Sequence, residues 1–433
     1  MGIAGSLRGC AKRVYQRLHF FGQADLLLRH RWQAKHAEAD YEERLFRPLP
    51  DANSIRSILI FKPDEIGDAV YALPAIAELR RALPQARLLL VCQSLAAPIY
   101  RASGLLDEIA AAKVRNPDGP FCFMSVSRTL DALSLRQFDL GIYLKPSPRY
   151  FRQFLRVPCR DRVYPNDARF PALSIYRPRV EHWGPVRAHA GVQLLQIVSG
   201  VTGRSYGHDS VVFPRMEWSP EDRARAATVF PDGALPERFG VIHPFVKDQT
   251  RRYPIAMWMQ LIRRLQQEFS FPWLVVGGPG DPQLELPAGV IQAQGRLSLG
   301  STGYLLSRAA AFVGLLSGPA HLAAACGTPS VTLFSGVSPV AEWAPLGRSL
   351  ILRSDVPCAP CESKTCPVFD VACMRELTPE RILPEIIDFL RRETCNDAAA
   401  LAARNRLASG ERTVDSAPPV TSVNAELFRI SNV

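Results

Sequence analysis

The chain has 433 residues, of which 47% are hydrophobic and 21% charged, and this composition is typical of a protein with packed apolar cores rather than of a disordered chain. At this length we expect two domains. The formal net charge of +11 favours anionic partners, whether acidic lipid, a phosphorylated sugar or nucleic acid, without choosing among them. The sequence has no run of about 18 uncharged apolar residues, so we expect no transmembrane helix.

The first 54 residues are expected to form a basic N-terminal extension. Residues 1–35 hold seven basic side chains and one acidic side chain, with apolar residues between them at roughly helical spacing. This pattern favours a basic amphipathic helix on an anionic membrane surface and, equally, a solvated helix packed on the protein body. The segment lacks the pattern of a secretory signal, and most of the ten cysteines are scattered. We therefore expect a cytoplasmic protein, either free or peripheral on the inner face of the membrane.

The next elements predict a βαβ unit. Residues 57–61 are a short apolar run typical of a buried parallel strand, residues 69–83 have helical periodicity, and residues 87–92 read as a second strand. Apolar segments at 108–112 and 140–144 can continue the same sheet. These elements predict an N-terminal domain over residues 55–200.

A second series of alternating elements follows in residues 201–395. We expect strands at residues 239–243, 273–276, 312–316 and 330–334, and helices at 255–269, 302–311 and 319–326. Residues 159–190 lack clear periodicity and are the expected interdomain region, leading into a helix near residues 189–198. Residues 396–433 are small and polar, so we expect a flexible tail. The predicted fold class is therefore α/β, with two successive domains.

The turn after the first strand is the first candidate site. It ends in Gly67 and Asp68 and lies at the carboxyl end of the strand, where open α/β sheets place their ligands. Asp68 can cap the following helix and complement its dipole, or it can act as a general base.

Two turns of the second series are candidates for binding an anion. Ser317 and Gly318 lie between a strand and a helix, where free backbone N–H groups and the helix dipole face a ligand, although many α/β loops share this pattern without binding anything. The segment from Lys247 to Arg252 gathers three cations before another helix. One of these cations could neutralise a diphosphate, and the alternative is a solvated basic loop.

Four thiols fall within sixteen residues, at Cys358, Cys361, Cys366 and Cys373. Their spacing is compatible with one tetrahedral zinc or iron ion but does not match a standard zinc finger. A reduced or partly disulfide-linked loop is the alternative.

Taken together, residues 55–392 resemble glycosyltransferase family 9, the family of the lipopolysaccharide heptosyltransferases. The resemblance rests on the Ile-Gly-Asp turn within residues 58–70, on the Ser-Gly-Pro-Ala-His run and Gly-Thr-Pro within residues 317–329, and on the basic-aromatic-proline loop at 251–254. In some relatives, cysteines like those described above hold iron or zinc. The residue before the Ser-Gly pair is usually acidic or polar in the family, whereas here it is Leu316.

The resemblance implies a GT-B fold, in which two Rossmann-like domains face each other across a cleft, and an inverting transfer of heptose or a related sugar from a nucleoside diphosphate sugar, first of all ADP-heptose, to a glycan or glycolipid. It implies Asp68 as the catalytic base and no catalytic metal ion. The implied donor-binding residues are Lys247, Arg251, Asp281, Ser317, Gly318 and His321, and the acceptor-side residues are Gly67 and Lys145.

Two other functions fit parts of the sequence. The first is a non-catalytic GT-B protein that binds acidic glycans or lipids, for which the Leu316 departure is the supporting feature. The second is a metal-stabilised nucleic-acid-binding protein, suggested by the cysteines and the positive charge. The cations are dispersed and no nucleic-acid-binding module is evident, so nucleic acid is not an expected partner.

Overall fold

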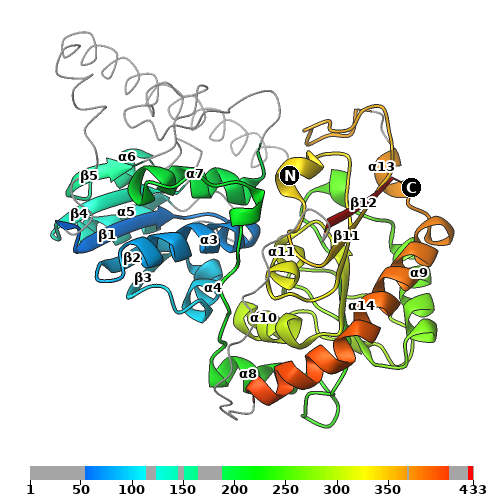
Figure 1. Ribbon diagram of the computed structural model, residues 1–433. Coiled ribbons are helices and arrows are strands. Elements are labelled where there is room, and N and C mark those ends of the chain that lie inside the picture. Colours follow the sequence, from blue (N-terminus) through cyan, green and yellow to red (C-terminus); the bar gives the residue numbers. More distant parts are fainter. Residues whose placement is uncertain are drawn as a thin grey trace, which may run out of the picture.

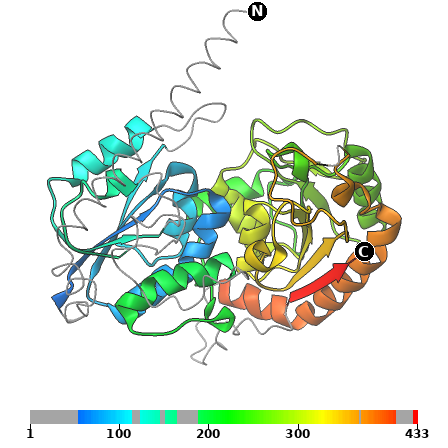
Figure 2. The same ribbon diagram turned by 90° about the horizontal axis from the view of Figure 1, so that it is seen from above.

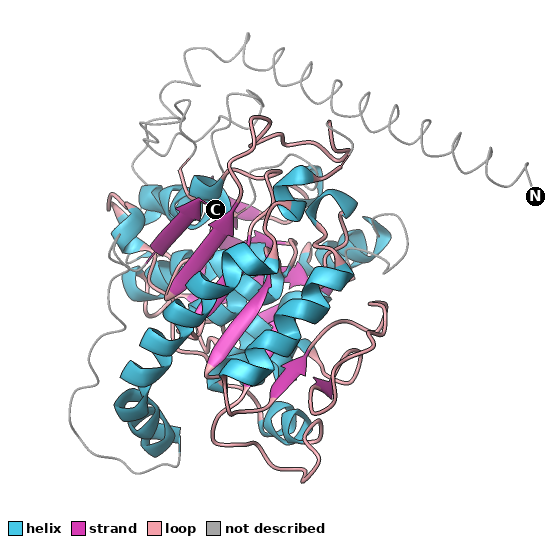
Figure 3. Cartoon of the chain, turned by 90° about the vertical axis from the view of Figure 1, so that its right-hand side faces the viewer, coloured by secondary structure: helices cyan, strands magenta, loops and turns pink. Residues whose placement is uncertain are grey.

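The computed structural model describes residues 54–113, 123–144, 151–163, 188–367, 370–408 and 428–432. These residues form two α/β domains that lie side by side, each built on one parallel sheet (Figure 1). Helices flank the strands, as the side view makes clear (Figure 3). No helix in these described ranges is both long and apolar enough to span a bilayer.

The first domain contains a five-stranded sheet with the order β3-β2-β1-β4-β5. Its strands are β1 (Ser57–Lys62), β2 (Arg87–Gln93), β3 (Glu108–Ala112), β4 (Phe138–Tyr143) and β5 (Cys159–Val163). The central strand β1 is apolar on both faces because helices cover both. Its Leu59 and Phe61 belong to one core cluster, and Ile58 and Ile60 belong to another. The predictions for β1 to β4 are confirmed.

Helices cover the two faces of this sheet separately. Core residues place α3 (Ile66–Ala82), α4 (Ala97–Ala102) and α7 (Ala190–Thr202) on one face, and α5 (Phe123–Leu133) and α6 (Phe151–Phe154) on the other. Helix α7 ends at Gly203, whose φ of +67° is the left-handed conformation that glycine adopts without steric cost.

The chain crosses between domains in residues 203–219, downstream of the region where we expected the connection. Helix α7 packs on α3 of the first domain, whereas α8 (Pro220–Ala227) packs on α10 of the second. Figure 1 shows the green segment running down between the two sheets to α8. Cys159–Val163, which we assigned to the interdomain region, is instead the edge strand β5, paired in parallel with β4.

The second domain contains a seven-stranded parallel sheet with the order β12-β11-β10-β9-β6-β7-β8. Its strands are β6 (Gly240–His243), β7 (Trp273–Val275), β8 (Ile291–Gln292), β9 (Ala311–Leu315), β10 (Ser330–Leu333), β11 (Ser349–Arg353) and β12 (Phe428–Asn432). Its helices after α8 are α9 (Ile255–Glu268), α10 (Leu299–Arg308), α11 (Gly318–Ala325), α12 (Val340–Trp343), α13 (Ala372–Arg375) and α14 (Pro379–Ala408). The four strands and three helices that we predicted here are present.

The C-terminal residues differ from the flexible tail that we expected. Residues 396–408 continue α14, because their alanines and leucine are strong helix formers. Phe428–Asn432 forms β12, which pairs in parallel with β11 and becomes the outer edge of the sheet. Figure 2 shows this strand in red beside the α14 helix.

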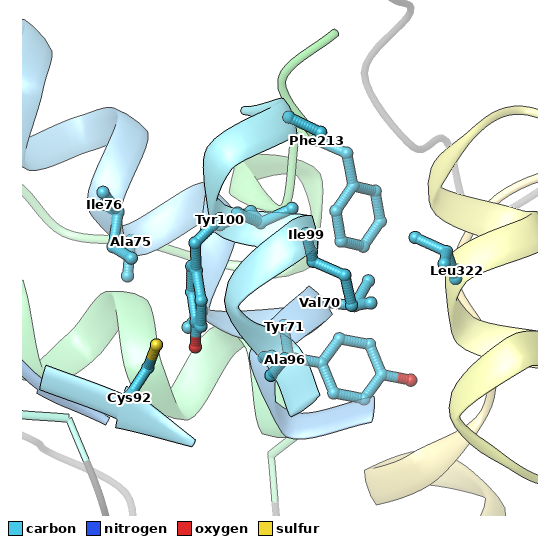
Figure 4. Close-up of a cluster of buried hydrophobic side chains, with 14 of the residues drawn as sticks. Val70, Tyr71, Ala75, Ile76, Cys92, Ala96, Ile99, Tyr100, Phe213 and Leu322 are labelled. Carbon is cyan, nitrogen blue, oxygen red and sulfur yellow. The ribbon is translucent and has the colours of Figure 1, made fainter. Parts of the chain in front are cut away.

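The two domains share one apolar core. The core cluster that contains α3 and α4 continues into α10 and α11 of the second domain. Figure 4 shows Val70 and Tyr71 of the first domain, with Phe213 of the connecting segment, on the side that faces the helix carrying Leu322. The relative placement of the domains is therefore fixed by packed side chains across a broad interface.

Each sheet has one point at which its strand order reverses. In the first sheet the chain runs from β1 outward through β2 and β3, and then returns to β4 on the other side of β1. In the second sheet the same reversal separates β6 from β9. Open α/β sheets bind ligands outside the carboxyl ends of the strands at such a reversal. The loops after β1, β6 and β9 are therefore the places to look for a site.

Candidate active site

The turn after β1 buries a lysine between two carboxylates. Lys62 Nζ lies 2.7 Å from Asp64 Oδ2 and 4.0 Å from Asp68 Oδ1. The Lys62 and Asp64 side chains are only 1% and 5% exposed, but the Asp68 side chain is 39% exposed. Asp68 is thus the member of this charged group that solvent or a ligand can reach, and it lies in the first turn of α3, where the helix dipole favours a carboxylate.

The pKa values of this group follow from its surroundings. Burial raises the pKa of Asp68 above its ordinary value, the Lys62 ammonium opposes that rise, and Glu65 adds to it. Solvent at the exposed part of the Asp68 side chain moderates the rise in its pKa. Burial lowers the pKa of Lys62 to about 8, so Lys62 is mostly protonated at neutral pH. Asp68 can therefore take up a proton near neutral pH more readily than an ordinary aspartate does.

Two glycines let the first turns of α3 and α11 touch across the domain boundary. A Cβ on Gly67 would lie 2.7 Å from His321 Cδ2, and a Cβ on Gly318 would lie 2.5 Å from Ile66 Cβ. Both separations are shorter than real Cβ contacts, so neither position has room for a side chain. The glycines that we selected from the turns thus serve close packing between the domains.

A hydrogen-bond network crosses the same boundary beside these glycines. The Tyr71 hydroxyl lies 2.8 Å from the Ala344 carbonyl oxygen, to which it donates, and 2.7 Å from His321 Nδ1. Because its proton goes to the carbonyl, His321 Nδ1–H is the donor to the Tyr71 oxygen. His189 accepts a bond from Gly191 N–H through Nδ1, so Nε2–H donates to the same Ala344 oxygen at 2.9 Å. The first domain therefore binds the Ala344 carbonyl through two side chains.

The histidines of this region are neutral at pH 7. Burial lowers the pKa of His321 to about 3, with a further contribution from His189. Burial lowers the pKa of His189 to about 4, against the hydrogen bond to Ala344. His243, at the end of β6, likewise has its pKa lowered to about 4 by burial. None of these imidazoles can supply positive charge to a ligand near neutral pH.

Ser317 begins α11 at the strand-order reversal of the second sheet. Its backbone is extended, and its hydroxyl donates to the Leu315 carbonyl at 3.0 Å while lying 3.2 Å from His243 Nδ1. His243 is the last residue of β6, so this contact joins the loops after β6 and β9. Ser317 and Gly318 thus lie at the predicted edge of the sheet.

Arg251 is the cation of the second domain that faces the cleft. It ends a 3₁₀ turn over Gln249–Arg251, and its Nη2 donates to Ser338 Oγ at 3.2 Å. Its buried Nε has no hydrogen-bond partner, although Asp248 Oδ2 lies 3.7 Å away. The Arg251 side chain is nevertheless 31% exposed and lines the pocket described below, so an incoming anion can reach its guanidinium group.

One pocket of about 350 Å³ brings the charged side chains of the first domain together with Arg251 of the second. Lys62, Asp68 and Tyr71 line it from the first domain, and Arg251 lines it from the second. The other lining residues are Ala190, Gln193 and Leu194 of α7, then Val337, Ser338, Pro339, Glu342, Trp343 and Glu362. The sequence had singled out only Asp68 and Arg251 from this set.

Other predicted site residues lie outside the lining of this pocket. Among the described residues, Ser317, Gly318 and Gly67 lie at the interface between α3 and α11, and His321 is buried against Tyr71. Lys247 is exposed on the loop before Arg251. Asp281 accepts a 2.7 Å hydrogen bond from Gly278 N–H and stabilises its own turn. Lys145 and residues 1–53 lie outside the described residues.

The four cysteines are free thiols, three on the loop that leads from β11 to α13 and Cys373 within α13. Burial raises the pKa of Cys373, and nearby Cys358, Cys361 and Cys366 contribute to the rise. Val371 N–H donates to Cys366 Sγ at 3.3 Å. Within the described part of this loop and of the chain, however, no three His, Cys, Asp or Glu side chains converge as a metal site requires.

Comparison with known proteins identifies the family that this architecture resembles. Residues 205–371 match the family model described as glycosyltransferase family 9 (heptosyltransferase). Lipopolysaccharide heptosyltransferase 1 of Pseudomonas aeruginosa is 33% identical over 159 residues, which are 32% of this chain and 44% of that protein. The matched part therefore spans less than half of that relative.

Solved structures share the fold over most of the chain. A family 9 glycosyltransferase from Veillonella parvula has a TM-score of 0.66 at 15% identity, covering 78% of this chain and 98% of that one. ADP-heptose lipopolysaccharide heptosyltransferase II of Escherichia coli has a TM-score of 0.61 at 17% identity, covering 78% and 99%. The Escherichia coli heptosyltransferase WaaC with ADP has a TM-score of 0.55 at 17% identity, covering 77% and 99%. The predicted GT-B fold is confirmed.

Proposed function

Since residues 205–371 form a glycosyltransferase family 9 domain within a fold shared with solved heptosyltransferases, we propose that this chain is an inverting glycosyltransferase. It transfers heptose or a related sugar from a nucleoside diphosphate, with ADP-heptose as the first candidate, to a hydroxyl of a lipopolysaccharide-type or other glycan. The names of two relatives support this choice, because one contains lipopolysaccharide and the other contains ADP-heptose.

The observation that carries the proposal is the pairing of Asp68 and Arg251 in one pocket from opposite domains. Transfer with inversion needs a base beside the attacking hydroxyl and positive charge beside the leaving diphosphate. Asp68 is an accessible carboxylate with a raised pKa, and Arg251 is a half-buried cation that lines the same pocket. Asp68 lies on the pocket wall formed by the first domain, and Arg251 lies on the wall formed by the second. The proposed base and the proposed cation therefore come from opposite sides of one pocket.

In the proposed reaction Asp68 takes the proton of the acceptor hydroxyl as that oxygen attacks the anomeric carbon. The bond from this carbon to the diphosphate oxygen breaks, and the negative charge moves to the leaving group. Arg251 stabilises that charge, and the positive end of α11, which begins after Ser317 outside the pocket lining, adds to the stabilisation. No step needs a catalytic metal ion, since these groups offset the charge.

The remaining donor residues take supporting roles in this proposal. Lys247, exposed on the loop of Arg251, adds positive charge near the diphosphate. Asp281 stabilises the glycine turn after β7, and its proposed role is to bind the nucleoside. Because His321 is neutral, it holds the α3–α11 contact through Tyr71 rather than adding charge. Gly67 and Lys145 remain proposed acceptor-side residues.

The acceptor is proposed to be a glycolipid at the cytoplasmic face of a membrane. The support is the excess of basic residues in residues 1–35 and the net charge of +11. Deleting residues 1–35 is expected to weaken binding to vesicles containing acidic lipid, measured by co-sedimentation. Equal binding of the full chain and the truncated chain would remove the membrane part of the proposal.

A structural zinc or iron ion at the four cysteines stays a separate prediction, and no step of the reaction depends on it. Elemental analysis of the purified protein tests it. One equivalent of zinc or iron per chain would support it, and its loss after Cys361→Ser would assign the ion to this loop. A metal content that is unaffected by Cys361→Ser would place any ion elsewhere.

The experiment that tests the proposed function is a donor screen. The protein is incubated with ADP-, UDP- and GDP-sugars and a glycan acceptor, and transfer is followed by mass spectrometry. We expect transfer from one donor class, and Arg251→Met should weaken binding of that nucleoside diphosphate at least tenfold by calorimetry. Arg252→Met, which alters the exposed neighbour, is the matched control and should change binding less than twofold. Absence of binding and of transfer for all donors would reject the proposal.

A further inference from the structure

Part of the pocket wall has no role in the proposed reaction as described so far. It is the segment after β10 that ends in the short helix α12, and it presents Glu342 and Trp343 to the pocket. Resting on the proposed function, we propose that Glu342 and Trp343 bind the transferred sugar itself, and so determine which sugar the protein accepts. Arg251 and the α11 turn then hold only the diphosphate.

Helix α12 is held in place by apolar packing within the second domain. Val340 and Ala344 form a small core cluster with Leu316, Phe334 and Ile351, and Trp343 packs against it. Leu316 is the residue that departs from the family pattern, and it is 6% exposed within this cluster. Its side chain therefore supports the wall of the pocket instead of contacting a ligand directly.

The first domain holds the same helix from across the cleft. The Ala344 carbonyl, one residue after α12, accepts hydrogen bonds from Tyr71 and His189 at 2.8 and 2.9 Å. Asp68 precedes Tyr71 by three residues on α3, and both residues line the pocket. The network thus ties the position of Glu342 and Trp343 to the helix that carries the proposed base. A sugar bound by these two side chains would be presented toward Asp68.

The chemistry of the two side chains suits a sugar rather than a phosphate. A carboxylate repels a diphosphate but accepts hydrogen bonds from hydroxyl groups, and a charged acceptor makes these bonds stronger than neutral ones. An indole offers a flat apolar surface with room for the C–H face of a pyranose ring. Glu342 is 8% exposed, so its hydrogen bonds to a ligand would be largely shielded from water.

Charged groups occupy different parts of this wall. Ser338, which accepts a hydrogen bond from Arg251, precedes Glu342 by four residues on the same segment. Arg251 and Glu342 thus mark two different parts of the wall, and Glu362, whose backbone N–H bonds to the Val337 carbonyl, adds another carboxylate to the pocket lining. A donor whose diphosphate meets Arg251 would place its uncharged sugar at Glu342 and Trp343.

The test compares the nucleoside diphosphate with its sugar conjugate. Glu342→Gln keeps the size of the side chain and removes its charge, and Trp343→Leu removes the indole. Calorimetry with ADP and with ADP-heptose, or with the pair that the donor screen selects, gives both affinities. Steady-state transfer gives KM and kcat for the preferred sugar and for two competing sugars. Glu285→Gln, at an exposed position of the second domain, is the control.

We expect each pocket variant to bind the free nucleoside diphosphate within twofold of wild type. Its affinity for the sugar conjugate should fall at least tenfold, and KM should rise in parallel. The differences in KM and kcat between the preferred sugar and the competing sugars should become smaller. The control should change none of these values by more than twofold. Thermal midpoints of all variants are measured alongside, because a structural loss would weaken both ligands together.

Three results would overturn the inference and leave the proposed function intact, and the first two concern ligand affinity. In one, wild-type protein transfers the sugar and Glu342→Gln and Trp343→Leu retain its affinity and selectivity. In the other, both variants lose the nucleoside diphosphate and the conjugate equally. A loss of kcat for every sugar with unchanged KM would also overturn it, by making Glu342 a base instead of a binding residue. Absence of binding and of transfer by the wild type would reject the proposed function itself.

Discussion

Replacing Tyr71 by Phe should loosen the contact between the two domains while leaving each domain folded. The substitution keeps the buried ring and removes only the hydroxyl, which bonds to the Ala344 carbonyl and to His321 Nδ1. A hydrogen bond contributes about 0.5–1.5 kcal/mol, so the loss of two costs about 1–3 kcal/mol. Since 1.4 kcal/mol corresponds to a factor of ten, the association between the two domains should weaken about 5- to 150-fold.

The assay is a distance distribution between spin labels placed on exposed positions of the two domains. For Tyr71→Phe we expect a broader distribution with a longer mean distance. The matched control is Tyr206→Phe, because the Tyr206 hydroxyl bonds to Glu78 and Thr202 within the first domain. The control should lower the thermal midpoint without changing the interdomain distances. Identical distributions for the wild type and Tyr71→Phe would refute the bridging role of this network.

Two further predictions follow from the same interface. Gly318→Ala should separate the domains and reduce transfer at least tenfold, because a Cβ has no room there. Gly207→Ala is the control, since Gly207 has open space around it, and it should leave transfer within twofold of wild type. Normal transfer by Gly318→Ala would contradict the close packing. Acid should destabilise the fold, because His189, His243 and His321 have pKa values lowered to about 4, 4 and 3. Below pH 6.5 the unfolded chain takes up protons that the folded chain does not, so each histidine removes about 1.4 kcal/mol of stability per pH unit as pH falls toward its folded pKa. Denaturant midpoints at pH 7.5 and 5.5 measure this, and equal midpoints would show that these imidazoles are not buried as neutral groups.

The sequence predicted those parts of the fold that depend on local pattern. Apolar runs such as the one that forms β1 are long enough to indicate buried parallel strands, and the helices between them have clear periodicity. Because parallel strands align their carboxyl ends, the positions of Asp68 and Arg251 at that edge followed from the order of elements. The edge strands β5 and β12 were missed because their sequences, Cys-Arg-Asp-Arg-Val and Phe-Arg-Ile-Ser-Asn, are short and mixed in polarity.

The site itself depends on contacts that no local pattern encodes. Tyr71 and His321 are 250 residues apart in the chain, and nothing near either residue indicates their hydrogen bond. Glu342 and Trp343 follow β10 as a single helical turn, too short for periodicity to predict it. Lys62 offered the one usable signal, since a charged residue that ends an apolar strand indicates a buried partner. In the sequence, Leu316 was notable only because the family usually has an acidic or polar residue at this position. Its place in a core cluster explains the apolar side chain.

The role of Asp68 is tested most directly by Asp68→Asn in the transfer reaction with the donor that the screen selects. Asparagine keeps the shape of the side chain but cannot accept the proton, so turnover should fall about 10²- to 10⁴-fold. Binding of the nucleoside diphosphate should stay within twofold of wild type, because Arg251 is on the opposite domain. Asp232→Asn, which alters an exposed acid that does not line the described pocket, is the control and should retain turnover. Turnover of Asp68→Asn within threefold of wild type would mean that another group accepts the proton.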